Sequence, residues 1–399
     1  MTRKKALLLC AGHNDLGLIF NLRKLGYYII ATGRIPGLCG EKYVDRYVNM
    51  DYSDQDAVLQ LAGEEKIDVI LPCCNDFGVY TAAYVAGKMN LPGHDSYEVT
   101  LTLHNKDKFK KFAEKQGLSV VPSFDFTSVD DACRWCENAE LPLIVKPVDA
   151  SAGNGISKIL SAGEIVPAIN KAFASSKSGR IVVERAISGT QHGFCTFLKD
   201  QKVVAFCSNN EYSFANPFRV EIDTWPADNE NEIKEFLIAQ IEKIAGILEL
   251  KDGIFHLQCI VENGKPYIIE VMRRILGNMY SIPAQMVSGF DWDYFETKAK
   301  CGLPDTVLPA GLASGGFFAY KTVLARENGV IESIEIPERL ERYIWDSFFV
   351  RKENDEITHW ASEPVGFLFM QFSSQEEMKK VLIDDYSNDF VVLKPEKIK

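Results

Sequence analysis

One carboxylate and two guanidinium groups follow a short apolar run in the segment 267–274, which reads YIIEVMRR. The run predicts the buried second strand of a hairpin whose turn falls at residues 262–265. Glu270, Arg273 and Arg274 then emerge together from a core, where charges are costly unless a partner compensates them. A metal-bound polyphosphate is one such partner, with Glu270 for the cation and an arginine for the oxyanion. A structural ion pair at the strand end is the alternative interpretation.

Lys146 ends a second predicted strand, and a run of small residues follows it five positions later. An ammonium group supplies a point charge for phosphate oxygens, and small residues let backbone N–H groups approach them. The order G-x-x-x-x-G-K-[ST] is absent, so this is not a P-loop. A hairpin with a glycine turn and a surface lysine remains the alternative.

Two further charges lie where they can act on the same ligand. Glu184 ends the predicted strand IVVE, where a carboxylate and free backbone groups can read the amino edge of adenine. Lys106 opens the basic amphipathic helix HNKDKFKKFAEKQG and can reach the same phosphates. The alternative for each is a solvated surface charge.

The elements that must position these residues begin with strands and helices that alternate through residues 1–100. This alternation predicts a doubly wound parallel sheet. Its first turn, residues 11–17, gives an incomplete G-x-G-x-x-G fingerprint, and the second strand ends at Thr32-Gly33-Arg34 without an acidic residue for a ribose. Both facts argue against a dinucleotide site. Further strands and helices follow, and residues 301–399 read as an appended α+β unit.

The composition narrows the class of protein. The net charge is −11, which argues against nucleic-acid binding as the main role. No run of about 18 apolar residues is present, so no membrane span is predicted. The ten cysteines show no framework spacing, and Cys133 and Cys136 form a lone C-x-x-C, so we expect reduced cysteines and a cytoplasmic protein.

The charged features occur in a recognisable order: a lysine before a helix, a lysine and then a glycine-containing loop, a glutamate after a strand, and I-E-x-x-x-R. In this order the chain resembles the ATP-grasp superfamily. The similar subgroup contains phosphoribosylglycinamide synthetase, the carbamoyl-phosphate synthetase large subunit and biotin carboxylase. The resemblance covers nearly the whole chain. It implies a pre-ATP-grasp Rossmann-like domain (1–100), an ATP-grasp domain (101–300) with a mobile lid (about 122–186), and a C-terminal α+β domain (301–399).

The resemblance also implies roles for individual residues. The expected ATP-binding positions are Lys106, Lys146, Ser151, Ala152, Gly153, Asn154, Gly155, Glu184, Arg185, Ala186, Ile187 and Gln191. Residues 151–155 correspond to the mobile phosphate loop, 184–187 to the adenine hinge, and Gln191 to the ribose contact. Glu270 and Gln258 are the expected ligands of Mg²⁺ or Mn²⁺. Glu270 and Arg274 are the expected catalytic residues, with Arg274 steadying the acyl phosphate or the substrate carboxylate.

Three positions depart from the family pattern, which has acidic residues at 191 and 258 and an asparagine at 272. This chain has Gln191, Gln258 and Met272. The amide oxygen of Gln258 can coordinate Mg²⁺ but carries no charge, and the sulfur of Met272 is too soft. The site therefore binds metal weakly, recruits another carboxylate, or has lost catalysis.

The resemblance implies an ATP-dependent ligase that joins a small-molecule carboxylate to an amine or ammonia through an acyl phosphate, with release of ADP and phosphate. It also implies a homodimer. Two alternatives stay open: an ATP-binding protein without turnover, and a nicotinamide-dependent enzyme that uses the N-terminal sheet.

Overall fold

The alternating strands and helices at the start of the chain build a parallel sheet. The computed structural model describes residues 3–150, 153–304 and 315–395. Within them, the first sheet has the strand order β3-β2-β1-β4, and its pairings are parallel. Its elements are β1 (Lys5–Leu8), α1 (Leu16–Lys24), β2 (Tyr28–Gly33), β3 (Arg46–Asn49), α2 (Gln55–Glu65), β4 (Val69–Leu71) and α3 (Asp76–Met89). The parallel sheet predicted for residues 1–100 is confirmed.

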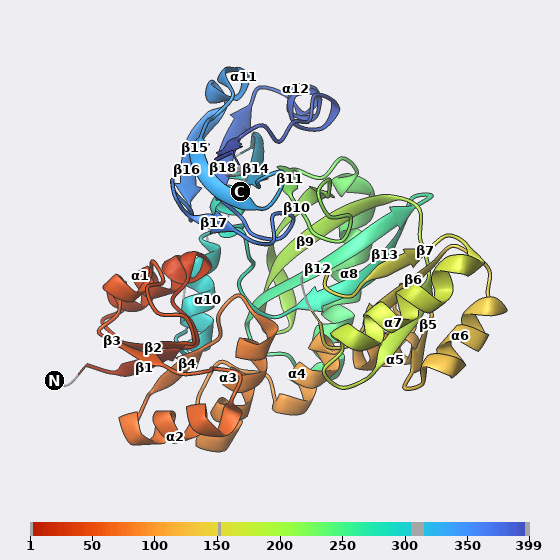
Figure 1. Cartoon of the computed structure of the whole chain (residues 1–399). Helices are drawn as coiled ribbons and strands as arrows, with labels where there is room; N and C mark the ends of the chain where they lie inside the picture. The colour runs from red at the N-terminus through yellow and green to blue at the C-terminus, as the bar shows by residue number, and fades with distance from the viewer. Residues whose placement is uncertain (1–2, 151–152, 305–314, 396–399) are drawn as a thin grey trace.

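Different helices cover the two faces of this sheet, because successive side chains of a strand point to opposite sides. Leu7 and Ile30 pack with α2 and α3. Leu8 and Ile29 pack with α1 and with α10 (Trp292–Lys300), which comes from much later in the chain. Helix α10 thereby ties the N-terminal sheet to the centre of the molecule, as Figure 1 shows.

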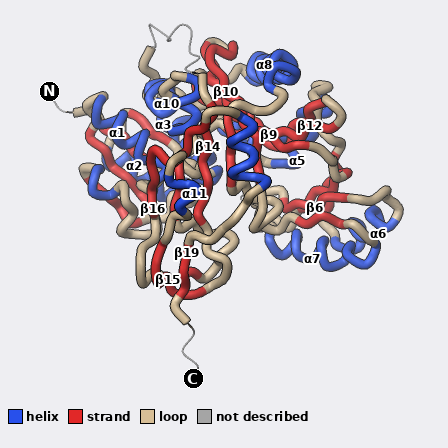
Figure 2. The backbone as a smooth tube through the Cα atoms, turned by 90° about the horizontal axis from the view of Figure 1, so that it is seen from above, coloured by secondary structure: helices blue, strands red, loops and turns tan. Residues whose placement is uncertain are grey.

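A small antiparallel sheet projects from the opposite side of the molecule in Figures 1 and 2. Its strand order is β5-β8-β6-β7 among the described residues. It follows α4 (Tyr97–His104) and α5 (Lys106–Lys115), and its elements are β5 (Ser123–Phe126), α6 (Val129–Glu137), β6 (Leu143–Pro147), β7 (Ser157–Ile159), α7 (Ile165–Ser175) and β8 (Ile181–Arg185). Apolar residues of α6, α7 and the sheet form one core. These elements coincide with the lid expected at about 122–186.

A larger antiparallel sheet lies between these two units. In the described part of the chain its order is β13-β12-β9-β10-β11-β14-β18-β16. Its strands are β9 (Thr190–Lys199), β10 (Lys202–Tyr212), β11 (Ile222–Trp225), β12 (Gly253–Glu262), β13 (Lys265–Met272), β14 (Phe317–Val323), β16 (Ile344–Phe349) and β18 (Gly366–Phe372). Helix α8 (Glu230–Leu248) packs on one face, and α9 (Ser281–Ser288) and α10 pack on the other.

The last hundred residues continue this sheet, since β14, β18 and β16 are its final strands. A second small sheet, β17-β15-β19, lies beside them, with β15 (Gly329–Ile334), α11 (Glu338–Glu341), β17 (Glu356–Ile357), α12 (Gln375–Lys379) and β19 (Val391–Leu393). The third unit is therefore joined to the second through shared strands, and the three domain boundaries stay predictions. Over the described ranges, the helices are too short or too polar to cross a membrane.

Candidate functional site

Glu184, at the end of β8, lies buried between two lysine side chains. Its Oε2 is 3.0 Å from Nζ of Lys146, and its Oε1 is 3.4 Å from Nζ of Lys110. Burial alone would raise the pKa of Glu184, but the two ammonium groups outweigh it and hold this pKa below its usual value. The carboxylate thus holds Lys146 in place, and its expected contact with the amino edge of adenine stays a prediction. Lys110 was not predicted, although it lies one helical turn after Lys106 on the same face of α5.

Lys106, the first residue of α5, connects three parts of the site. Its Nζ is 3.2 Å from Oε1 of Glu270 and donates a hydrogen bond of 2.9 Å to the carbonyl of Ala150. Burial would lower the pKa of Lys106, but the charges of Glu270 and Asp76 raise it above its ordinary value. Lys106 therefore links Glu270 on β13 to Ala150, the residue just before the expected phosphate loop.

The expected phosphate loop is described only in part, because Ser151 and Ala152 lie outside the described residues. Gly153 and Gly155 have φ of +74° and +73°. A Cβ at Gly153 would come 2.6 Å from the carbonyl oxygen of Phe218, and one at Gly155 would come 2.6 Å from Cγ of Pro147. Both positions therefore require glycine, which suits a loop whose backbone approaches a ligand. Asn154 between them is exposed.

The hinge expected at 184–187 makes contacts of its own. Arg185 forms an exposed ion pair of 2.9 Å with Glu262 in the hairpin turn. The backbone N–H of Ala186 donates to the carbonyl of Pro142. Ile187 is only partly buried. The nucleotide-binding roles of these residues stay predictions.

The two arginines after Glu270 have separate partners, and neither pairs with Glu270. Arg274 lies 2.8 Å from Asp76, the first residue of α3, which also lies 3.3 Å from His104. Burial would raise the pKa of Asp76, but Arg274 and His104 outweigh it and lower this pKa strongly. Arg274 therefore joins the N-terminal unit to β13 through an ion pair, and the charge of Glu270 acts on it without direct pairing.

Arg273 is buried, and its guanidinium is bound by groups of the protein itself. It is 3% exposed, pairs with Asp95 at 3.0 Å, and donates to the backbone carbonyls of Lys251, Gly253 and Ile254. These contacts satisfy the guanidinium inside the protein, which is what a buried arginine needs.

We expect Arg273→Ala to lower the free energy of unfolding by about 3–5 kcal/mol, because it removes the cation that pairs with Asp95 and the donor of three carbonyl groups. Urea denaturation measures this loss. The control is Arg134→Ala, which removes an ion pair whose side chains are 73% and 60% exposed and should change little. Equal losses in the two variants would contradict a structural role for Arg273.

Gln258 on β12 lies directly opposite Glu270 on β13. The hairpin that sets this register turns at Asn263 and Gly264, with φ of +52° and +77°, as the sequence predicted. Nε2 of Gln258 is 2.9 and 2.8 Å from the two carboxylate oxygens of Glu211 on β10, and Nε2 of Gln191 is 2.6 Å from Oε2. Gln191 thus contacts a carboxylate. Burial raises the pKa of Glu211 to about 7.

Glu211 could not be predicted from spacing. It lies 47 residues before Gln258, and the two meet only through the order of strands in the sheet. Met272 is 9% exposed and packs in the core opposite His256. Its thioether is no substitute for an oxygen ligand.

Glu270 and Gln258, on the neighbouring strands β13 and β12, are the two side chains whose oxygen atoms would hold a metal ion. In the described parts of the chain, no group of three or more His, Cys, Asp or Glu residues is placed to bind an ion by itself. This donor set suits Mg²⁺, which is usually held by one or two carboxylates together with water and substrate phosphates. A cation would therefore fit as a partner of a bound nucleotide.

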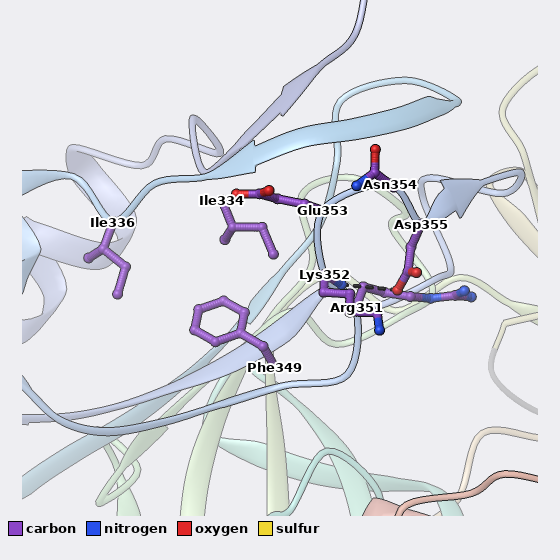
Figure 3. Close-up of a pocket in the computed structure, with 8 residues that line it drawn as sticks. All are labelled: Ile334, Ile336, Phe349, Arg351, Lys352, Glu353, Asn354 and Asp355. Carbon is purple, nitrogen blue, oxygen red and sulfur yellow. Dashed lines mark hydrogen bonds between the residues drawn. The ribbon is translucent and has the colours of Figure 1, made fainter.

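A hollow of about 820 Å³ lies elsewhere, in the C-terminal unit. Figure 3 shows Ile334, Ile336 and Phe349 around it, with the charged segment 351–355 at one side. All of its lining residues come from β15, β16 and the segments that follow them. It is therefore separate from the ion pairs described above. A smaller hollow is lined by Asp76, His104 and Lys106 together with neighbouring residues.

Comparison with known proteins finds similar sequences and similar solved structures. Residues 105–304 match the family model described as carbamoyl-phosphate synthase L chain, ATP binding domain. A formate-dependent phosphoribosylglycinamide formyltransferase from Janthinobacterium sp. (strain Marseille) is 29% identical over 189 residues, which is 46% of this chain and 46% of that protein. The matched segment thus spans about half the length of this relative.

Two solved structures are similar over almost the whole chain. Phosphoribosylglycinamide synthetase from Anaerococcus prevotii has a TM-score of 0.77 at 22% identity, covering 98% of this chain and 100% of that one. An L-amino acid ligase from Bacillus licheniformis has a TM-score of 0.82 at 18% identity, covering 99% and 100%. These likenesses establish the fold. Because the family model covers half of the sequence, the chain belongs to the family of the carbamoyl-phosphate synthase L chain ATP-binding domain, in the ATP-grasp superfamily.

Proposed function

We propose that this chain is an ATP-dependent ligase that joins a carboxylate to an amine or ammonia. ATP phosphorylates the carboxylate, and the amine then attacks the acyl phosphate, forming a C–N bond and releasing phosphate alongside the ADP. The main support for this proposal is that charged side chains from distant parts of the chain lie close together. Lys106 pairs with Glu270, and Lys146 pairs with Glu184. The charge of Glu184 also acts on Lys106. These residues come from three different parts of the chain.

Each group has a task in such a reaction. The ammonium groups of Lys106 and Lys146 neutralise charge on the phosphates, which is the main demand of phosphoryl transfer. Arg274, held by Asp76, presents positive charge to the developing acyl phosphate or the substrate carboxylate. The sheet β5-β8-β6-β7 serves as the lid that keeps water from the acyl phosphate. Mg²⁺ or Mn²⁺, held by Glu270 and Gln258, supplies further neutralisation when bound.

The relatives support the class of reaction. Two carry names that refer to phosphoribosylglycinamide, and one is named an L-amino acid ligase. These names differ in substrate, so we propose the reaction class and leave the carboxylate and the amine to experiment. We further propose a cytoplasmic protein that acts on small molecules.

A second function is an ATP-binding protein without turnover. It is favoured by Met272, whose buried thioether cannot bind Mg²⁺, and by the uncharged amide at Gln258. Measuring ADP release with pooled carboxylates and pooled amines separates the two functions. Tight nucleotide binding without ADP release in any pool would favour the second.

We expect ATP with Mg²⁺ or Mn²⁺ to raise the melting temperature, and NAD to leave it unchanged. A ligand at 100 times its Kd stabilises the native state by about 2.7 kcal/mol. In the N-terminal turn, the backbone N–H of Gly12 already donates to Oδ2 of Asp15 at 2.9 Å, so this group is not free for a pyrophosphate. Thermal unfolding with each ligand provides the measurement, and an equal or larger shift with NAD would contradict the nucleotide assignment.

A further inference from the structure

The amide of Gln258 is oriented by a carboxylate on the far side from Glu270. Nε2 of Gln258 lies within 2.9 Å of both oxygens of Glu211. An ionised carboxylate only accepts hydrogen bonds, so the nitrogen end of the amide must face it. The oxygen end, Oε1, then points away from Glu211, and within the described residues it accepts no hydrogen bond from the protein.

Glu270 lies on the side to which Oε1 is left free. Directly opposite residues of an antiparallel pair have Cβ atoms about 4.5–5.5 Å apart, and Gln258 and Glu270 are such a pair. Oε1 of Glu270 is held by Lys106. Its Oε2 has no hydrogen bond to the described part of the protein. Two hard oxygen atoms on neighbouring strands are thus available together.

Gly193 is what permits the contact between Gln258 and Glu211. Strand β9 lies between β12 and β10, and Gly193 is the residue of β9 paired with Gln258 on one side and with Asn209 on the other. A Cβ at Gly193 would come 2.9 Å from Oε1 of Glu211 and 2.5 Å from Oδ1 of Asn209. The missing side chain lets Gln258 reach across a whole strand.

Burial and a second amide also restrict the carboxylate of Glu211. The residue is 8% exposed, and Gln191 on β9 donates a further hydrogen bond of 2.6 Å to Oε2. No arginine or lysine in the described ranges forms an ion pair with it. Among the described residues, side-chain amides are therefore the groups that this buried carboxylate holds in place.

We propose that Glu211 is a positioning residue of the metal site. It holds the amide of Gln258 with its oxygen toward Glu270, without being a ligand itself. Hydrogen bonds from outer carboxylates fix and polarise metal ligands in this way, and their loss typically weakens metal binding about 10- to 100-fold. This inference rests on the proposed function, since it assigns a cation to the same site.

The test is a charge exchange between positions 211 and 258. Mn²⁺ binding in the presence of ADP is measured by electron paramagnetic resonance of the free ion. The proteins are the wild type, Glu211→Gln, Gln258→Glu and the double variant. We expect Glu211→Gln to weaken Mn²⁺ binding about 10- to 100-fold, and the double variant to recover most of the loss because the charge has moved to position 258. Gln258→Glu alone sets two carboxylates face to face, so it should bind Mn²⁺ less tightly than the double variant.

Asp223→Asn is the matched control. Asp223 on β11 is also a buried carboxylate and lies directly opposite Glu211, but it bonds to Asn209 and does not contact Gln258. If Asp223→Asn weakens Mn²⁺ binding as much as Glu211→Gln, general electrostatics explain the effect and the positioning role is wrong. Wild-type binding in Glu211→Gln, or a double variant no better than this single variant, would also overturn it.

Thermal unfolding and Mn²⁺ binding by the wild type separate failure of this inference from misfolding and from failure of the proposed function. Thermal unfolding shows whether each variant is folded, and if Glu211→Gln is not, the double variant compared with Gln258→Glu carries the test. Nucleotide-dependent Mn²⁺ binding by the wild type, with no effect of Glu211, would reject this inference and leave the proposed function standing. Absence of such binding in the wild type would reject both.

Discussion

Replacing Glu270 with glutamine is expected to lower turnover at least about 100-fold, the scale seen when one preorganised electrostatic group is removed from an active site. Nucleotide binding should persist, because Lys106 and Lys146 remain. Of the two proposed metal ligands, Gln258 on β12 and Glu270 on β13, only Glu270 carries a charge. In the structure Glu270 pairs with Lys106 at 3.2 Å. The measurement is ADP release as a function of Mg²⁺ concentration, together with ADP affinity by calorimetry.

The control for this variant lies in the same hairpin. Glu262→Gln changes a carboxylate in the turn of β12 and β13, where it pairs with the exposed Arg185. We expect it to leave turnover unchanged. Full activity in Glu270→Gln would mean that Glu270 serves only as a structural partner of Lys106, and it would remove the main reason for placing a metal here.

Much of the fold was predictable because local patterns determine it. The alternation of apolar strands and amphipathic helices fixed the N-terminal sheet, and Asn263-Gly264 fixed the hairpin and hence the opposition of Gln258 and Glu270. The elements between residues 122 and 186 were also predictable, since they are consecutive in sequence, and their role as a lid stays a prediction. Helices α4, α9 and α10 were not predicted. For α10 a signal existed, because Asp291 caps it by accepting from the N–H of Tyr294.

The partners of the charged residues were not predictable in the same way. Lys106, Lys146 and Glu270 were expected at the site from their order along the chain, but Asp76 and Asp95, the acids that pair with Arg274 and Arg273, come from the first hundred residues. Such contacts depend on how whole units pack. The last hundred residues illustrate the same limit. They were expected as an appended α+β unit, but the pairing of β14, β18 and β16 with the central sheet could not be predicted from local patterns.

Replacing Lys146 with alanine is expected to weaken ATP binding about 10- to 150-fold, because a charge-assisted hydrogen bond contributes about 1.5–3 kcal/mol. The fold should survive, since Glu184 keeps Lys110 as a partner at 3.4 Å. Calorimetric titration with ATP measures the affinity. Lys158→Ala, which removes an exposed lysine from the neighbouring strand β7, is the control and should bind ATP like the wild type.

The exposure of the two lysines at Glu184 differs, and we expect the more exposed one to meet the nucleotide. The side chain of Lys110 is 2% exposed, and its Nζ also contacts the carbonyl of Val121. The side chain of Lys146 is 10% exposed and lies on β6, the strand that leads into the glycine-containing loop. Lys110→Met should therefore reduce stability more than affinity, and Lys146→Ala the reverse. Unchanged affinity in Lys146→Ala would mean that residues 146–155 form an ordinary hairpin connection and that the phosphates bind elsewhere.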